Sequence, residues 1–463
     1  MIHGLKLPEI TRKRLMDIVL LQIDLLYYAA SCNEIDKDHC AHYLDDQPLA
    51  ERFKGRGQAI TGWLWEPRTT VRHEYLERFA ILGREERLTK LAWCSRLQKE
   101  VCEFTEMHTD ATKISAKIDD FFDGEPPPRG KESESQLTWH GAARDFLRYF
   151  YKDYLGTQEP FPAELFSGDD RAKFGREQLL HAFFAEENRG LEVCPACDAS
   201  HYFTRGQKTM HTVLDHYLPK SLYPHFSCHP YNLIPVCYFC NSSVKGEKDP
   251  LIDGQNQRQP LPRSALPYGN IDLSSHTYLD IEVKQSSSPI TINALLTRPD
   301  KPEELAEGEL QRALEILARV YDIPERWQRA SDTISEALFR RIRQFLGRSS
   351  TMATALPTGF DAPHEVNNLL EQLLFYLSDK DEDLRKDPYA FAMTWILVAL
   401  INEYVQPAIE AQKDRQTNIG YDAPNYDPSL LKEFVSWFGQ DLGKNDERAG
   451  KARNLLKVPH YRS

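Results

Sequence analysis

Apolar residues recur every three or four positions along much of residues 1–190, which is the spacing of one buried helix face. The pattern is plainest at Leu15, Ile18, Leu21, Leu25 and Tyr28. It is repeated in three later stretches, VRHEYLERFAILG, TKLAWCSRLQKEVCEF and TWHGAARDFLRYFYKDYLG, and a further helix is expected in QLLHAFFAEENRG. The spacing therefore predicts a mainly helical N-terminal part of the chain.

One polar stretch interrupts these helices. Residues 123–137 are rich in Pro, Gly, Ser and charged side chains, a composition typical of a linker. We expect it to separate an N-terminal helical region, residues 1–122, from a helical lead-in, residues 138–190.

The hydrophobic pattern changes after the lead-in. A cysteine-rich module occupies residues 191–254, and a loop with a β-hairpin is expected in residues 255–300, where apolar and polar residues alternate over Leu279–Val283 and again over Ile290–Ile292. Residues 301–463 return to helical spacing. Their apolar run, AFAMTWILVALI, is shorter than the roughly 20 residues that span a bilayer, so it predicts a buried helix.

Length and charge limit the classes of protein that the chain can belong to. A chain of 463 residues is long enough for two to four domains. Its net charge is −12, whereas nucleic-acid binding relies on Lys and Arg to displace counterions. Any polyanion would therefore bind at a local basic patch or with the help of a partner. The N-terminus has no apolar signal-peptide stretch, so we expect a soluble, cytoplasmic protein without a membrane contact.

Two C-x-x-C pairs stand out among the nine cysteines: Cys194, Cys197, Cys237 and Cys240. In a reducing compartment this spacing favours metal binding over disulfides. Four thiolates form a closed tetrahedral shell for Zn²⁺, which would stabilise the fold and take no part in chemistry. The alternative is chance pairing in a buried core. The remaining cysteines have no such spacing, and we expect most of them to be small buried residues. They are Cys32, Cys40, Cys94, Cys102 and Cys228.

Between the cysteine pairs lie residue types that suit hydrolysis of a phosphodiester. Asp215 and His216 are adjacent, Asn232 follows in the same loop, and Asn241 comes directly after the last cysteine. A neutral imidazole can take a proton from water near neutral pH. Carboxylate and amide oxygens are ligands that Mg²⁺ or Mn²⁺ prefers. The alternative is an ordinary turn in a zinc module that only binds a partner.

The two segments LDHYLPKS and YNLIPVCYFCNSSVKG together resemble the signature of the HNH (His-Me finger, ββα-metal) endonuclease family in its zinc-containing form. The resemblance covers residues 191–250. It implies two short antiparallel strands and a helix with a catalytic metal between them, so the fold class is expected to be mainly α with a small embedded α+β module. One departure is the loop after Pro219–Ser221, LYPHFSCHPY, which is bulkier than the glycine-containing loop of many members.

The resemblance also implies roles for the four central residues. His216 would be the general base that activates water. Asp215 and Asn241 would hold the catalytic Mg²⁺ or Mn²⁺. Asn232 would orient His216 through its loop, which is an indirect task.

The resemblance also bears on four further residues of the module. Lys245 and Lys220 would face the phosphate backbone of the substrate. The family pattern has no role for His225 and His229, which are either extra ligands or histidines of the core or surface.

The function implied by the resemblance is that of a metal-dependent endonuclease hydrolysing DNA. Bacterial proteins of this type serve in anti-phage defence or restriction, some of them with a protein partner such as an ATPase subunit. No motif for sequence-specific recognition is visible. Two alternatives remain open: a non-catalytic zinc scaffold that recruits other proteins, and an RNA-directed nuclease of the same fold.

Overall fold

The computed structural model describes residues 2–46, 49, 53–66, 72–110, 112–122, 138–154, 175–183, 188, 191–199, 212–269, 273–283, 290–297, 307–348 and 388–402. The predicted linker at residues 123–137 and the last 61 residues from 403 to 463 lie outside this set. The chain divides into two compact units. The first comprises Met1–Ala196, His201–Leu273 and Pro302–Tyr321, and the second comprises Cys197–Ser200, Ser274–Lys301 and Asp322–Ser463. The described residues are mostly helical, with small antiparallel sheets.

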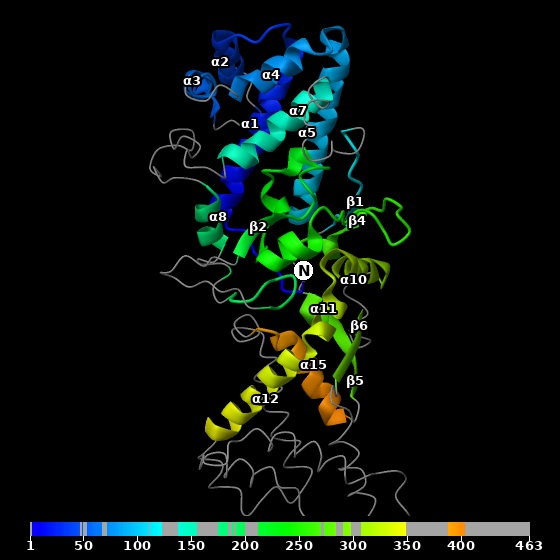
Figure 1. The fold of residues 1–463 in the computed structure, drawn as a ribbon. Coiled ribbons are helices and arrows are strands. Elements are labelled where there is room, and N and C mark those ends of the chain that lie inside the picture. The colour runs from blue at the N-terminus through cyan, green and yellow to red at the C-terminus, as the bar shows by residue number, and fades with distance from the viewer. Residues whose placement is uncertain are drawn as a thin grey trace, which may run out of the picture. The chain divides into compact units, whose positions relative to one another are not determined.

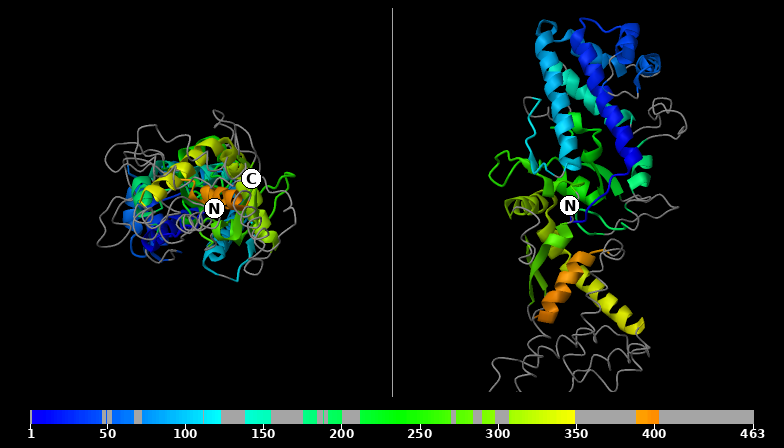
Figure 2. Two further views of the ribbon diagram at one scale, coloured as in Figure 1. Left: turned by 90° about the horizontal axis from the view of Figure 1, so that it is seen from below. Right: turned by 180° about the vertical axis from the view of Figure 1, so that it is seen from behind.

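Two long helices, α1 (Glu9–Ser31) and α5 (Arg87–Thr109), lie side by side in the first unit (Figures 1 and 2). The apolar residues of α1 that the spacing assigns to one face are all at most 3% exposed, so the predicted face is the buried one. Helices α4 (Arg72–Ile81) and α7 (Trp139–Tyr149) pack against each other, and α4 also contacts α1. Helix α7 begins where Thr138 accepts a hydrogen bond from the Gly141 amide, a common N-cap.

Two short helices of this unit have no clear signal in the hydrophobic pattern. They are α2 (Lys37–Asp46) and α3 (Gly57–Leu64), which pack against each other. Their approach requires glycine at position 57, because a Cβ there would lie 2.0 Å from the carbonyl oxygen of Ala41. Such a contact depends on the partner helix, and a periodicity search along one segment does not reveal it.

The strands and turns of the cysteine-rich module lie within the first unit, whereas its residues Cys197–Ser200 belong to the second. Strand β2 (Thr212–His216) pairs antiparallel with β3 (Leu233–Cys237), and His216 faces Leu233 in the register. The 3₁₀ turns η5 (Pro224–Phe226) and η6 (Pro230–Asn232) lie in the loop between them, and the π-helical segment η7 (Phe239–Lys245) follows β3. Every residue of β3 is buried.

Helices of the same unit surround this module on several sides. Helix α7 and α5 contact η5, α1 contacts η6, α8 (Arg176–Phe183) contacts β2, and α10 (Glu307–Tyr321) contacts η7. The N-terminal helices and the module therefore share one core. The remaining elements of the unit are short: η2 (Arg84–Glu86), the π-helical η3 (Phe150–Tyr154), η8 (Arg263–Ala265), and the strands β1 (Ser115–Ala116) and β4 (Leu261–Pro262), which pair antiparallel.

The second unit is a hairpin with helices packed on it. Strands β5 (Thr277–Val283) and β6 (Ile290–Thr297) pair antiparallel at the positions where the sequence predicts a hairpin, after the short helix α9 (Leu273–His276). Helix α11 (Ile323–Arg329) contacts β6, whereas α15 (Ala390–Leu400) contacts β5 and α12 (Ser331–Arg348). Helix α15 is the apolar run, and seven of its residues are buried. Among the helices of the described residues, none has both the length and the apolar character needed to cross a membrane.

A buried histidine makes the first unit sensitive to acid. The ring of His108 in α5 stacks on Tyr231 with centroids 4.2 Å apart, and its Nδ1 donates to the Phe104 carbonyl oxygen at 2.8 Å. Burial lowers the pKa of His108 to about 3, with a smaller contribution from Arg263. Its ordinary pKa is 6.5, so the unfolded chain takes up this proton first as the pH falls. The stability that neutral His108 contributes is complete above pH 6.5 and is lost as the pH falls from 6.5 toward 3.

We therefore expect the free energy of unfolding to fall by about 2 kcal/mol at pH 5 on account of this group alone. The unfolded chain binds more protons than the folded chain below pH 7. The substitution His108→Phe should reduce this difference by about one proton at pH 5, and by less at pH 7. Urea denaturation at several pH values measures it. The control is Leu88→Phe, which changes no titratable group and lies at an exposed position of the same helix. An unchanged slope in His108→Phe would contradict the assignment.

Candidate functional site

The end of strand β2, the loop after it and the segment η7 line one pocket of about 910 Å³ in the first unit. The pocket brings together most of the residues that the sequence analysis selects. They are Asp215, His216, Lys220, Asn241 and Lys245. Asn232 does not line the pocket and lies fully buried behind it. The end of β2, the loop after it and η7 thus bring these five residues to one cavity.

His216 is the last residue of β2 and is 6% exposed. Its Nε2 lies 3.0 Å from the carbonyl oxygen of Ser227. A carbonyl oxygen only accepts, so Nε2 carries the hydrogen and Nδ1 keeps the lone pair. Burial lowers the pKa of His216 well below its ordinary value, and the charges of Lys220 and Lys245 lower it further. The ring is therefore neutral at neutral pH, with Nδ1 as its basic atom.

The loop that carries Ser227 is held by Asn232. The Asn232 side chain accepts from the Leu218 amide at 2.7 Å and donates to the carbonyl oxygens of Leu218 at 3.1 Å and Phe226 at 3.0 Å. The Ser227 hydroxyl donates to the Leu147 carbonyl oxygen at the end of α7, at 3.0 Å. These bonds join both ends of the loop to each other and to a helix. They keep the Ser227 carbonyl oxygen in place for His216.

Asp215 lies next to His216 in the same strand and is 3% exposed. Its Oδ1 lies 3.3 Å from Nζ of Lys245, whose side chain is 1% exposed. Its Oδ2 is buried and has no hydrogen-bond partner among the described residues. Burial raises the pKa of Asp215 to about 6, although Lys245 acts in the opposite direction. The carboxylate is thus charged at neutral pH with one oxygen unsatisfied.

This oxygen and the half-buried Asn241 are the two oxygen donors that the sequence analysis expects to hold a catalytic cation. Both residues line the same pocket, and both supply hard oxygen ligands of the kind that Mg²⁺ and Mn²⁺ prefer. A buried carboxylate oxygen without a partner is costly unless something satisfies it. Asp215 and Asn241 therefore offer oxygen donors of the type that a divalent cation would use.

The helical lead-in contributes three charged or aromatic residues to the pocket that escaped the sequence analysis: Arg148, Tyr151 and Arg176. The rings of Tyr151 and His216 meet edge to face with centroids 4.1 Å apart. The guanidinium of Arg176 lies 4.2 Å from the centre of the Tyr151 ring and donates to the Tyr151 carbonyl oxygen at 2.9 Å. No signal in the sequence connects these residues to the module, because more than 35 positions separate each of them from Asp215.

The lead-in makes one wall of the pocket basic. Nζ of Lys220 lies 4.9 Å from the centre of the Tyr151 ring, on which Arg176 also packs. Burial lowers the pKa of Lys220 to about 8, and the charges of Arg176 and Arg148 contribute to this shift. Only two carboxylates, Asp215 and Glu247, line the described part of the pocket. The wall therefore carries an excess of positive charge that suits an anionic ligand.

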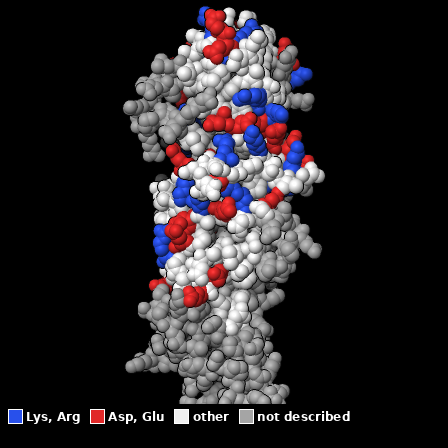
Figure 3. All heavy atoms as spheres, turned by 90° about the vertical axis from the view of Figure 1, so that its right-hand side faces the viewer, with Lys and Arg blue, Asp and Glu red and all other residues white. Residues whose placement is uncertain are grey.

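The outer surface shows no comparable excess on the face drawn in Figure 3. There Lys and Arg side chains lie among Asp and Glu side chains, without a continuous basic area. This agrees with the net charge of −12. Positive charge is concentrated in the pocket and is not spread over that face.

The four cysteines of the two C-x-x-C pairs form a buried cluster in which the Sγ atoms all lie within 4.8 Å of one another. The Sγ atoms of Cys194 and Cys240 are 3.8 Å apart. This is too long for a disulfide, but it equals the separation of about 3.8 Å between two sulfurs bound tetrahedrally to one zinc at about 2.3 Å. The amides of Cys237 and Cys240 each donate to a cysteine sulfur at 3.4 Å. The cluster can therefore bind a metal such as zinc.

The other cysteines follow the expectation in part. Cys40, Cys94 and Cys228 are fully buried, whereas Cys32 is half-buried and Cys102 is exposed. None of the five belongs to the metal cluster among the described residues.

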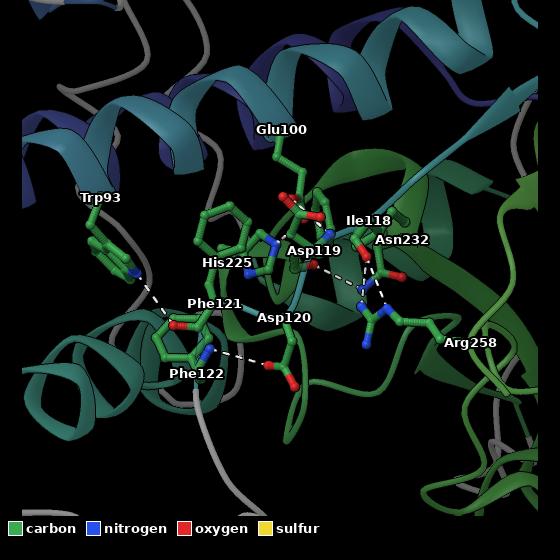
Figure 4. Close-up of polar contacts among 11 residues, drawn as sticks. Trp93, Glu100, Ile118, Asp119, Asp120, Phe121, Phe122, His225, Asn232 and Arg258 are labelled. Carbon is green, nitrogen blue, oxygen red and sulfur yellow. Dashed lines mark hydrogen bonds and ion pairs between the residues drawn. The ribbon is translucent and has the colours of Figure 1, made fainter. Parts of the chain in front are cut away.

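The two unassigned histidines lie in the core and not at the pocket. Nε2 of His225 lies 3.1 Å from Oε1 of Glu100 in α5, and Figure 4 shows the two side chains pointing toward each other. Nε2 of His229 lies 3.1 Å from Oγ1 of Thr105 in the same helix. Both histidines are at most 1% exposed. Their contacts favour a role in packing the loop against α5 over a role as extra metal ligands.

No protein-family model, curated protein or solved structure matches the chain. Inference about function therefore rests on the pocket, its charges and the cysteine cluster.

Zinc content tests the cysteine cluster. We expect the purified chain to hold about one zinc per molecule, and Cys237→Ser to lose most of it together with the folded structure of the module, because structural zinc contributes directly to folding. Elemental analysis and thermal denaturation measure both effects. The matched control is Cys102→Ser, which changes an exposed cysteine outside the cluster. Equal zinc content in the two variants would rule out the cluster as the binding site.

Proposed function

We propose that the chain is a metal-dependent endonuclease of the HNH type that hydrolyses phosphodiester bonds in DNA. The observation that carries the proposal is the pairing of His216, whose Nε2 is held by the Ser227 carbonyl oxygen, with the unsatisfied carboxylate oxygen of Asp215 in one basic pocket. A positioned base, an oxygen ligand set and a cationic wall are the groups that hydrolysis of a phosphate diester requires. The antiparallel pair β2 and β3 with the following segment η7 is the kind of arrangement that the HNH resemblance implies.

His216 supplies the base in this mechanism. Its Nδ1 takes a proton from a water molecule, and the resulting hydroxide attacks the phosphorus atom. A P–O ester bond then breaks, and the leaving oxygen takes a proton from solvent. The positive charge that forms on the ring is stabilised by the Ser227 carbonyl oxygen at Nε2.

Asp215 and Asn241 would hold the divalent cation. When bound, it supplies stabilisation of the negative charge that builds on the phosphate and on the leaving oxygen. Asn232 maintains the loop geometry on which His216 depends, and it does not touch the reacting atoms. This division of tasks follows from the contacts of each side chain.

The wall formed by Arg148, Arg176 and Lys220 would neutralise the phosphates next to the cleaved bond. Because the chain carries a net charge of −12, capture of DNA has to occur where positive charge is concentrated. An interior wall of this kind gives the sugar-phosphate backbone a local site without sequence readout. The resemblance extends the proposal to bacterial anti-phage defence or restriction in the cytoplasm, with a protein partner such as an ATPase subunit.

Cleavage of supercoiled plasmid in Mg²⁺ or Mn²⁺ tests the proposal. We expect the intact chain to produce nicked or linear DNA, and His216→Ala to reduce the rate by 10²-fold or more, as loss of a general base does. His39→Ala, at an exposed position of α2, is the matched control and should keep the full rate. Equal cleavage by His216→Ala and the intact chain would refute the assignment. Parallel reactions on labelled RNA distinguish the RNA-directed alternative, which predicts faster cleavage of RNA.

The basic wall is tested separately by salt dependence. We expect Lys220→Met to weaken DNA binding and to reduce the slope of log K against log[KCl] by about one, the effect of losing one phosphate contact. Fluorescence anisotropy with a labelled duplex measures it, in Ca²⁺ to limit cleavage. Lys99→Met is the control, because that side chain is 76% exposed on α5. A slope for Lys220→Met equal to that of the control would exclude a phosphate contact.

A further inference from the structure

Lys245 is unusual among the cations of the pocket because it contacts Asp215 directly. Nζ lies 3.3 Å from Oδ1 of Asp215, and the two side chains are 1% and 4% exposed. A lysine is rarely buried to this degree unless a charge of opposite sign faces it. Lys245 is therefore the counterion of Asp215 in this structure, although the sequence analysis expects it to face the phosphate backbone.

The end of segment η7 places Lys245 beside the proposed cation ligands. Asn241 and Lys245 belong to the same π-helical turn, which closes where the Gly246 amide donates to the Asn241 carbonyl oxygen at 3.0 Å. Gly246 has a φ of +51°, a left-handed conformation that lets the chain leave the turn at this point. Asp215, Asn241 and Lys245 all line the pocket. The ammonium group of Lys245 is thus paired with the carboxylate of Asp215, the group that would bind the divalent cation.

Two cations cannot share this carboxylate without repulsion. A divalent ion binds carboxylate oxygen at about 2.1 Å, and the ammonium group already lies 3.3 Å from Oδ1. Burial of both side chains reduces solvent screening of their charges. Arg148, Arg176 and Lys220 add further positive charge to the same pocket. In the absence of substrate, the pocket is consequently unfavourable for a second strong cation.

We propose that Lys245 is a built-in competitor of the catalytic cation at Asp215, released when a substrate phosphate draws its ammonium group away. This inference rests on the proposed nuclease function and deepens it. A phosphate in the pocket offers Lys245 an alternative anion, which frees Asp215 for the metal. Binding of DNA and binding of the divalent cation then reinforce each other, and linkage requires the effect to be mutual. The chain would hold its catalytic cation weakly until DNA is present.

The first test is binding of Mn²⁺ to the intact, zinc-loaded chain without DNA. The electron paramagnetic resonance signal of free Mn²⁺ measures the binding. Lys245→Met keeps the length of the side chain and removes its charge, so we expect it to lower the Kd for Mn²⁺ by tenfold or more. Lys245→Arg keeps the charge and should retain the native Kd. Lys248→Met removes the same charge from an exposed position three residues on, and it should also retain the native Kd.

Three outcomes separate this inference from the function on which it rests. If Lys245→Met binds Mn²⁺ no tighter than the native chain while Asp215→Asn loses the ion, Lys245 is not a competitor and the nuclease proposal stands. If Asp215→Asn binds Mn²⁺ as the native chain does, the cation lies elsewhere and both proposals fail. Should Lys245→Met fail to fold, Lys245→Gln, which can still donate to Asp215, takes its place with the same expected direction.

The coupling to DNA gives the second test. In His216→Ala, which should leave DNA intact, we expect a short duplex to lower the Kd for Mn²⁺ by tenfold or more, after subtraction of Mn²⁺ bound by the duplex alone. In the double variant His216→Ala with Lys245→Met the duplex should have little further effect. An equal effect of DNA in the two chains would overturn the proposed release of Lys245.

Discussion

The hydrogen bond from His216 Nε2 to the Ser227 carbonyl oxygen is the contact on which the site depends. It determines the tautomer of the ring, so it determines which nitrogen can take a proton. The bond requires Ser227 to stay at one position in a loop of irregular structure. Asn232 meets this requirement by bonding backbone atoms on both sides of the loop, and the Ser227 hydroxyl adds a bond to the end of α7. A small module could not hold such a loop by its own short strands.

The helices around the module supply the rest of the constraint. Helix α5 contributes Glu100 and Thr105, which contact the two histidines of the loop. These contacts pack the loop against α5. The same packing removes water from Asp215, His216 and Lys245, which strengthens the electrostatic interactions among them. Burial thus shifts the pKa of Asp215 upward and that of His216 downward, while Lys220 and Lys245 of the motif lower both.

The cysteine cluster combines short-range order within each C-x-x-C pair with long-range contacts between the two pairs. Each C-x-x-C pair brings two sulfurs together within a few residues. The Cys240 amide donates to Sγ of Cys237 within the second pair, whereas the Cys237 amide donates to Sγ of Cys194 and so joins the two pairs. The last cysteine lies one residue before Asn241, at the start of the turn that also carries Lys245. A metal in this cluster would consequently hold one side of the pocket without entering its chemistry.

Local patterns in the sequence were enough to predict the buried face of α1 and the hairpin of β5 and β6. They also identified the two cysteine pairs as a metal cluster and selected Asp215 and His216 as candidate site residues. Each of these patterns involves residues that are close together along the chain. The pattern did not reveal α2 and α3, whose packing depends on the approach of Gly57 to Ala41. Only the tertiary structure brought Arg148, Tyr151 and Arg176 to the pocket, placed Ser227 against His216 and paired Lys245 with Asp215. These contacts join segments that are separate in sequence, and the free energy that selects them comes from burial in a shared core, which periodicity along one segment does not encode.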